Sequence, residues 1–431
     1  MVKQAISVVA AVAALAGLVA QARADLKSFL AKPEPAYKWE KRDQKSLSNG
    51  TFYDLHLVSQ TWQGRPWEHR LMVFKPAHLE HPEFCSLLNT GGNGSNGDIA
   101  LGMQVANGTG CMAAILFNIP NQPLYDKTED ALVVYTWQKY LETGDDSWPL
   151  HFPMAKSVIK AMDAIQEFAK SESLPAVDSF MVYGASKRGW TTWLVGASRD
   201  PRVKAIAPMV IDTLNVAAQI PHQLQAYGKA SEQVADYTNA GMLTALNSPQ
   251  GRKLMELEDP YSYRDILTLP KLLVLGTNDQ YWAQDALNIY WDGLKGPKWV
   301  SYTPNSGHGL ENKVHVFATA TAFIRMVAEH GKWPKLHWSY TPTADGGQQI
   351  HVTSDTPIVS ARLFHNSAAT QDFRDTLSWA ADPIEVKGNE ATGTMAPPAS
   401  GYTAIFGEVT FEQDGKPYTL STQISILSAK K

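Results

Sequence analysis

Apolar and polar residues alternate along two segments near the start of the chain. Residues 51–62 and 69–75 both switch between apolar and polar side chains, and residues 64–66 between them are Gly-Arg-Pro. This alternation is typical of a strand that buries one face, and glycine with proline is typical of a turn. The pattern predicts a β-hairpin that leads into a larger sheet.

The middle of the chain alternates short apolar runs with segments of helical period. Residues 155–171 and 311–329 repeat apolar side chains at the helical spacing, and residues 213–267 read as a long helical insertion. The apolar runs that we expect as buried strands are residues 85–90, 111–117, 179–183, 205–211, 271–276 and 299–303. Strands alternating with helices predict a mostly parallel sheet covered on both faces, with residues 213–267 as a lid.

The character of the chain changes after Pro334. Short strand-like runs follow one another without a helical period, and turn residues such as Asp414 and Gly415 separate them. These runs are residues 337–340, 349–353, 358–364, 384–387, 402–411 and 418–427. Such spacing predicts an all-β sandwich of immunoglobulin-like type over residues 335–431, after a first folded domain over residues 25–334.

Residues 1–24 have the pattern of a secretory signal peptide. Lys3 supplies a positive charge, residues 5–20 are apolar, and Ala22-Arg23-Ala24 provides the small residues of a cleavage site. The apolar run is short for a bilayer span, and a retained membrane anchor is the alternative. We expect cleavage after Ala24 and a periplasmic or secreted protein.

Length and charge limit the class of protein and its partners. The chain has 431 residues, more than one compact core holds, and its 44% hydrophobic and 19% charged residues are ordinary for a folded protein. A net charge of −4 offers no basic field for nucleic acid or anionic lipid. We expect a small-molecule or peptide substrate, no nucleic-acid partner and no stable membrane span after signal cleavage.

Two cysteines open neighbouring predicted strands. Cys85 begins the run 85–90, and Cys111 begins the run 111–117. In adjacent parallel strands the two thiols would lie at matching ends, and an oxidising compartment would permit a disulfide. Two buried free thiols are the equal alternative. Since no Cys/His cluster has ligand spacing, we expect no structural metal.

A serine stands where an apolar run ends and a helix is expected to begin. The run 179–183 leads into Gly184-Ala185-Ser186. Small residues let the backbone turn sharply, and such a strand-to-helix turn presents the nucleophilic serine of α/β-hydrolases. The sequence therefore predicts an α/β-hydrolase-like fold with Ser186 as the nucleophile, the alternative being a serine that only caps a helix.

An acid and a histidine follow Ser186 in the order that α/β-hydrolases use. Asp279 and His308 each come after an expected strand. The serine needs a histidine to take its proton and an acid to hold that histidine in the useful tautomer. We assign Ser186, Asp279 and His308 as a triad, with Asp212, which ends an earlier strand, as the alternative acid.

Two places supply backbone N–H groups for an oxyanion hole. Lys187 follows the serine directly, and the glycine-rich turn with Gly91, Gly92 and Asn93 follows the strand 85–90. In α/β-hydrolases these two positions bind the negative charge that develops on the substrate carbonyl. A flexible loop and a phosphate cradle are the alternatives, but the cradle lacks the Gly-Lys-Ser/Thr ending of a P-loop.

The serine turn departs from the usual pattern in one respect. Arg188 occupies the position where the pattern has glycine, and Gly189 comes one residue later. The planar guanidinium can bind a substrate carboxylate in bidentate geometry or form a structural ion pair, and both interpretations stay open. Tyr281, Trp282 and Trp190 are candidates for the walls of a substrate pocket, with the core as the alternative.

Three segments together resemble the PhoPQ-activated pathogenicity-related family. They are Gly-Ala-Ser-Lys-Arg-Gly-Trp-Thr-Thr-Trp-Leu, Gly-Thr-Asn-Asp-Gln-Tyr-Trp and Asn-Ser-Gly-His-Gly, at residues 184–194, 276–282 and 305–309. The resemblance implies a secreted α/β-hydrolase-like domain with a C-terminal β domain and a link to envelope stress or virulence. The serine turn is also similar to those of prolyl-peptidase-like hydrolases and glucuronoyl esterases.

These residues predict a serine hydrolase that forms an acyl-enzyme from an amide or an ester, with no metal or organic cofactor. A peptide-like substrate is favoured by analogy with hydrolases that carry a lid and an appended β domain. A carboxylesterase of glucuronoyl-esterase type is one alternative. A non-catalytic secreted binding or signalling protein on a hydrolase fold is the other.

Overall fold

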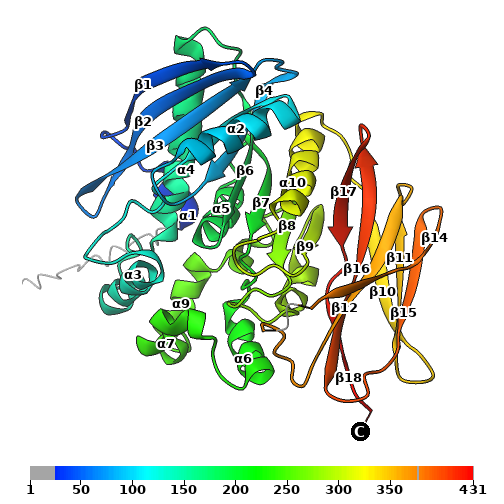
Figure 1. Cartoon of the computed structure of the whole chain (residues 1–431). Helices are drawn as coiled ribbons and strands as arrows, with labels where there is room; N and C mark the ends of the chain where they lie inside the picture. The colour runs from blue at the N-terminus through cyan, green and yellow to red at the C-terminus, as the bar shows by residue number, and fades with distance from the viewer. Residues whose placement is uncertain (1–24, 376–377, 431) are drawn as a thin grey trace, which may run out of the picture.

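A mixed, mostly parallel sheet forms the centre of the molecule (Figure 1). This computed structural model describes residues 25–375 and 378–430. The central strands follow the order β1-β2-β3-β5-β4-β6-β7-β8-β9. Their bounds are β1 (Lys38–Leu47), β2 (Gly50–Trp62), β3 (Arg65–Pro76), β4 (His81–Asn89), β5 (Cys111–Leu116), β6 (Ser179–Ala185), β7 (Val203–Met209), β8 (Lys271–Gly276) and β9 (Lys298–Thr303).

The predicted hairpin is present as β2 and β3, which pair antiparallel. Strand β1 pairs with β2 at the edge of the sheet and was not expected, because almost all of its residues are exposed and follow no apolar alternation. Its sequence Lys-Trp-Glu-Lys-Arg-Asp-Gln-Lys-Ser-Leu is rich in charge. Charged side chains on an edge strand discourage pairing with other molecules, so this composition suits its place.

The parallel strands bring their carboxyl ends to one edge of the sheet. Strand β4 pairs with both β5 and β6, and the parallel pairing continues through β7 and β8 to β9. Residues of β5 and β8 are buried throughout, which explains their continuous apolar runs. The loops that follow β4, β6, β7, β8 and β9 therefore gather at one end of the molecule.

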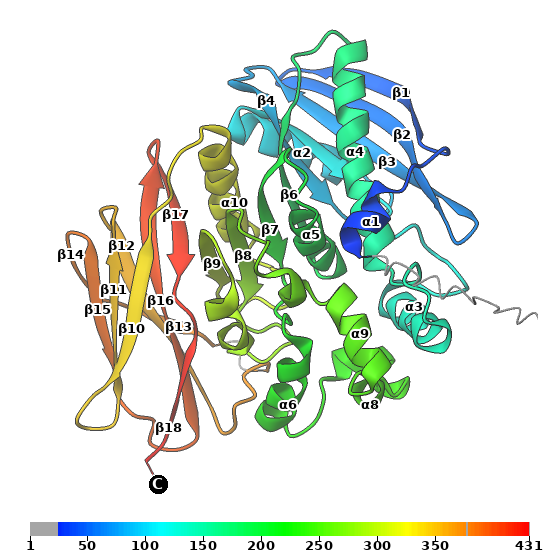
Figure 2. The same cartoon turned by 180° about the vertical axis from the view of Figure 1, so that it is seen from behind.

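Helices cover both faces of the sheet (Figures 1 and 2). One face carries α2 (Asn96–Thr109) and α10 (Lys313–Ala328), and the other carries α1 (Leu26–Ala31), α4 (His151–Ser171) and α5 (Lys187–Ala197). On α4, the residues with the predicted helical spacing, Val158, Met162 and Ile165, are fully buried. The apolar face that the sequence predicts for this helix is therefore the face that packs into the core.

The two cysteines lie on opposite faces of the sheet. In the pairing of β4 with β5, Cys85 is opposite Met112, one residue beyond Cys111. Because successive side chains of a strand point to opposite faces, Cys85 packs into the core with Met112 while Cys111 packs into the core on the other side. Both thiols are free and buried, so the disulfide alternative is wrong.

The segment between β7 and β8 is helical, as expected. It lies with α3 (Glu129–Thr143) at the end of the molecule where the parallel strands end (Figures 1 and 2). Its elements are α6 (Val216–Tyr227), η1 (Glu232–Val234), α7 (Ala235–Asn239), α8 (Met242–Ala245), α9 (Pro249–Glu258) and η2 (Pro260–Tyr263). We call residues 213–267 the lid. Two short turns, η3 (Ala286–Ile289) and η4 (Trp291–Gly293), follow β8.

The C-terminal strands form two packed antiparallel sheets, which we call the C-terminal sandwich. One sheet has the order β10-β11-β15-β14, and the other continues from β9 in the order β17-β16-β12-β13, with β18 also paired to β16. The bounds are β10 (Leu336–Pro342), β11 (Gln348–Ser354), β12 (Ser360–Ala368), β13 (Ala380–Pro383), β14 (Glu385–Lys387), β15 (Glu390–Met395), β16 (Tyr402–Gln413), β17 (Lys416–Ser421) and β18 (Ser425–Ser428).

The two sheets approach closely enough to restrict side-chain size. A Cβ atom at Gly407 would lie 2.8 Å from Cδ1 of Ile350 on the facing sheet. The run 418–427, expected as one strand, is divided into β17 and β18. The fold is thus an α/β-hydrolase-like sheet followed by an all-β sandwich, as the sequence predicts.

The N-terminal signal peptide that we expect, residues 1–24, lies outside the described residues. Among the residues that the structure does describe, no helix has both the length and the apolar character needed to cross a bilayer.

The buried thiols give a direct test of the strand register. We expect the native protein to react slowly with a thiol reagent such as Ellman's reagent and to release two thiols per chain after denaturation, because burial raises the pKa of Cys111 to about 12 and that of Cys85 further. Reductant should leave the melting temperature unchanged. A non-reduced protein without titratable thiols after denaturation would contradict the register.

Candidate active site

Ser186 stands on a strained turn between β6 and α5. Its backbone has φ 57° and ψ −126°, outside the region that a serine ordinarily adopts. Two hydrogen bonds hold the turn, from the Ser186 N–H to the Met209 carbonyl and from the Trp190 N–H to the Ser186 carbonyl, both at 2.9 Å. This is the geometry that a nucleophilic serine needs at a strand-to-helix turn.

Two glycines make room for this turn. A Cβ atom at Gly184 would lie 2.5 Å from Nδ2 of Asn89, and one at Gly189 would lie 2.8 Å from the carbonyl oxygen of Met209. The Asn89 amide donates to the Tyr183 carbonyl at 2.8 Å and so joins β4 to β6 beneath the turn. Gly189 thus supplies the close approach of α5, one residue later than the usual pattern has its glycine.

The loops after β8 and β9 bring Asp279 and His308 together. Oδ2 of Asp279 lies 2.8 Å from Nδ1 of His308, and the Tyr281 N–H donates to Oδ1 of Asp279 at 2.9 Å. The Asp279 side chain is 6% exposed and that of His308 22%. A carboxylate in this position fixes the histidine ring and favours the tautomer with the proton on Nδ1.

The hydrogen bond to Asp279 involves only one of the two ring nitrogens of His308. Nε2 is buried and has no hydrogen-bond partner among the described residues, so His308 is not hydrogen-bonded to Ser186. Catalytic hydrogen bonds are often long without a substrate. The Tyr281 ring packs on the His308 ring with centroids 4.2 Å apart, and Tyr281 lines a pocket together with Ser186. Tyr281 therefore packs on His308 and lines the same pocket as Ser186.

Asp212, the alternative acid, makes a different contact. It follows β7 and accepts a hydrogen bond from the Tyr290 hydroxyl at 2.6 Å. Burial raises the pKa of its carboxyl to about 8, even though the Tyr290 bond lowers it. Asp212 and Asp279 line one small internal cavity, but the structure joins His308 to Asp279.

The expected oxyanion-hole residues lie on loops of neighbouring strands. Lys187 is the first residue of α5, where an N–H has no acceptor within the helix. Gly91, Gly92 and Asn93 follow β4, which pairs with β6. Gly92 has φ 68°, and the Asn93 carbonyl accepts from Nη1 of Arg70 at 3.1 Å, so this loop is fixed to β3. Their role as donors stays a prediction.

Arg188 forms an ion pair with a carboxylate of the protein. Its Nη1 and Nη2 each donate to Glu129 at 2.8 Å, and Nε donates to the Ile119 carbonyl at 2.5 Å. Although burial raises the pKa of Glu129, Arg188 and Lys187 outweigh it and lower that pKa to about 2. The guanidinium also closes against Gly91, where a Cβ atom would lie 2.6 Å away. Of the two roles considered for Arg188, the structure shows the ion pair within the protein.

An apolar pocket opens beside Ser186 under the lid. Its cavity volume is about 100 Å³. Trp190, Tyr281 and Trp282, the wall residues expected from the sequence, line it. The lid contributes an apolar wall that includes Val216, Ile220, Leu224, Val234, Met242 and Leu246.

The two charges at the pocket neutralise each other. Nζ of Lys187 lies 3.1 Å from Oδ1 of Asp130, and the Tyr237 hydroxyl donates to the same oxygen at 3.2 Å. Asp130 and Glu129 could not be predicted as site residues, because an acidic pair in the first turn of a helix is an ordinary feature of helix starts. In the described part of the chain, no group of three or more His, Cys, Asp or Glu side chains is arranged to hold a metal ion.

Comparison with known proteins decides the family. The family model described as PhoPQ-activated pathogenicity-related protein matches residues 26–374. The chain belongs to this family. Within the curated proteins, this member of the PhoPQ-activated pathogenicity-related family is 30% identical over 428 residues to Autocrine proliferation repressor protein A of Dictyostelium discoideum, covering 90% of the chain and 85% of that protein.

Solved structures of hydrolases are similar to this family member at lower identity. The acetyl xylan esterase of Paenibacillus sp. R4 is 14% identical with a TM-score of 0.47, covering 69% of this family member and 91% of the esterase. The S-formylglutathione hydrolase of Agrobacterium tumefaciens is 14% identical with a TM-score of 0.41, covering 68% and 96%. At 14% identity, the reactions of these two enzymes are not assigned to this family member.

The raised pKa of Asp212 predicts how stability depends on pH. Between about pH 4 and about pH 8 the folded protein holds a proton on Asp212 that the unfolded chain has lost, so the free energy of unfolding falls as pH rises. Asp212→Asn, which keeps an acceptor for Tyr290, should remove this slope of at most about 1.4 kcal/mol per pH unit. Urea unfolding at pH 5 and pH 8 measures it. An equal wild-type-to-variant difference at both pH values would contradict a protonated Asp212.

Proposed function

We propose that this protein is a serine hydrolase that cleaves an ester or an amide through an acyl-enzyme. The observation that carries the proposal is the Asp279–His308 pair, whose free Nε2 lies beside a wall residue of the Ser186 pocket. A strained serine, an oriented histidine and an apolar pocket beside the serine are features that acyl transfer uses.

In the proposed reaction, Oγ of Ser186 attacks the substrate carbonyl while Nε2 of His308 takes its proton. Asp279 stabilises the imidazolium that forms, and the N–H groups of Lys187 and Gly92 hold the negative oxygen of the tetrahedral intermediate. His308 then gives the proton to the leaving alcohol or amine. A water molecule reverses these steps to release the acid and restore Ser186. None of these steps calls for a metal or an organic cofactor.

The pocket favours an apolar acyl group. Its walls are mostly aliphatic and aromatic, with Thr213, Gln219 and Gln223 as uncharged polar members, and its Lys187–Asp130 pair is already neutralised. A glucuronoyl ester would place a polar sugar acid against these walls, and Arg188 is held by Glu129, so this alternative is the weaker one. We favour a peptide-like amide with an apolar residue on the acyl side, by analogy with lidded hydrolases that carry a β domain.

The cellular location and biological role of the reaction are inferred from the sequence and the family. The sequence of residues 1–24 predicts export, and the family name refers to pathogenicity. We therefore place the enzyme in the periplasm or outside the cell, with a role in envelope stress or virulence.

A second candidate function is non-catalytic signalling. Autocrine proliferation repressor protein A, which is 30% identical, is named for an effect on proliferation rather than for a reaction. A hydrolase fold with intact residues does not by itself prove turnover. In this alternative, the protein would bind a receptor and leave Ser186 unused.

A fluorophosphonate probe separates the two candidates. We expect wild-type protein to be labelled at Ser186 and Ser186→Ala to remain unlabelled. Asp279→Asn should lower kcat by about 10⁴-fold, because it upsets the tautomer of His308. The matched variant Asp212→Asn should change kcat little. Well-folded wild-type protein that resists the probe would favour the signalling candidate, and a larger loss in Asp212→Asn would reverse the assignment of the acid.

A series of acyl esters tests the pocket. The kcat/KM for p-nitrophenyl esters should rise from acetate to hexanoate, by up to roughly fourfold per buried methylene, because each contributes about 0.8 kcal/mol. Leu246→Glu, in the pocket wall, should flatten the series, whereas Leu101→Glu on the distant helix α2 should not. A flat series in the wild type would count against an apolar acyl site.

A further inference from the structure

The loop between β12 and β13 of the C-terminal sandwich reaches the catalytic end of the hydrolase sheet. Four of its residues, Asp372, Phe373, Arg374 and Trp379, contact the lid or the loops of Asp279 and His308, directly or through one another. We call these four residues the brace. None of them belongs to the catalytic apparatus described above.

Phe373 and Trp379 hold the two catalytic loops. The side-chain amide of Asn278, the residue before Asp279, donates to the Phe373 carbonyl at 3.0 Å. Asn305, in the histidine loop, donates to the Trp379 carbonyl at 3.1 Å and accepts from its N–H at 2.9 Å. The Phe373 side chain is fully buried in a core cluster that the hydrolase part and the sandwich share, so this attachment is anchored.

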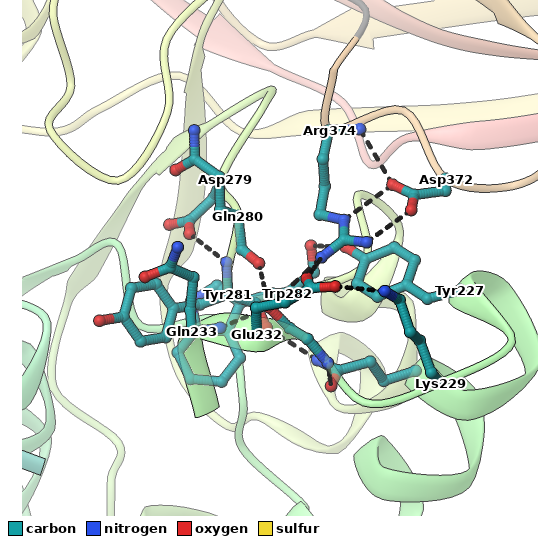
Figure 3. A network of polar contacts seen from close by, with 12 residues as sticks. Tyr227, Lys229, Glu232, Gln233, Asp279, Gln280, Tyr281, Trp282, Asp372 and Arg374 are labelled. Atoms are coloured by element: carbon teal, nitrogen blue, oxygen red, sulfur yellow. Dashed lines mark hydrogen bonds and ion pairs between the residues drawn. The ribbon is translucent and has the colours of Figure 1, made fainter. Parts of the chain in front are cut away.

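Arg374 holds the lid (Figure 3). Its Nη1 donates to Glu232 at 3.1 Å and to the Ser231 hydroxyl at 3.3 Å, and its guanidinium lies 3.9 Å from the centre of the Tyr227 ring. Asp372 fixes the other side of the guanidinium through bonds of 2.8 and 2.6 Å. A planar group held at both edges and on one face has little freedom to leave.

The lid residues that Arg374 contacts are bonded in turn to the acid loop. The Ser231 hydroxyl donates to the Gln280 carbonyl at 2.7 Å, and the Tyr227 hydroxyl donates to the Trp282 carbonyl. Figure 3 shows Arg374, Tyr227 and the loop from Asp279 to Trp282 drawn together in one network. The side chain of Arg374 is only 11% exposed, whereas that of its lid partner Glu232 is 59% exposed, so the guanidinium is buried beneath a carboxylate at the surface.

We propose that Arg374 is a positioning residue for the hydrolase reaction, through which the C-terminal sandwich sets the lid and the loop of the catalytic acid. This inference rests on the proposed function for its effect on turnover. Its structural half, that Arg374 orders lid residues 223–233 and loop residues 279–282, stands on the contacts alone. The sandwich then acts as part of the active site.

Arg374→Ala tests the brace by two readouts. We expect faster amide hydrogen exchange in peptides that cover residues 223–233 and 279–282, with exchange in β10, β11 and β16 unchanged. We also expect kcat/KM for the best ester or amide to fall by about 10- to 100-fold, because small displacements of catalytic groups have effects of this size. Arg374→Lys, which keeps the charge beside Glu232, should recover part of both. The matched control is Lys387→Ala, an exposed sandwich cation paired with Glu385.

The readouts distinguish this inference from the proposed function. If wild-type protein neither hydrolyses substrate nor reacts with the fluorophosphonate, the proposed function fails and the exchange comparison alone decides on the brace. Exchange in Arg374→Ala equal to that of the wild type overturns the inference. Faster exchange throughout the sandwich also overturns it, since that indicates a general loss of stability. So does an active wild type whose kcat/KM is unchanged in Arg374→Ala.

Discussion

The left-handed backbone at Ser186 is the constraint on which the site depends. A serine with positive φ persists only where its surroundings determine it, and here the carbonyl of Met209 and the close approach at Gly184 and Gly189 do so. The same turn begins α5, which places the N–H of Lys187 at the free end of a helix. One strained residue therefore fixes both the expected nucleophile and an expected oxyanion donor.

The parallel sheet then supplies the rest of the site by its geometry. Strands β6, β7, β8 and β9 end at one edge, so the residues that follow them meet although they are far apart along the chain. The acid follows β8 and the histidine follows β9. The lid closes over the same edge with an apolar wall, and charges near it are neutralised in pairs.

Much of this arrangement could be predicted from the sequence, because buried strands and the serine turn leave local patterns. The chain order of Ser186, Asp279 and His308 follows from one such pattern. Contacts between distant surfaces leave none: the Arg188–Glu129 pair joins residues 59 apart, and Arg374 reaches Ser231 across 143 residues. Strand β1 was also missed, since its exposed residues lack an apolar period. Helix α3 was missed although Leu132, Thr136 and Tyr140 are buried at helical spacing, a signal that the sequence does contain.

The pairing of β9 with β17 joins the hydrolase sheet to the C-terminal sandwich. The two strands pair at Val300 and Ser421, and Oγ of Ser421 accepts from the Tyr302 N–H at 3.0 Å. If the sandwich were removed, β9 would expose its backbone groups as a template for aggregation, and Phe373 would leave a hole in the neighbouring core. Recombination that exchanges the sandwich for another module would therefore have to replace both a sheet edge and a buried side chain.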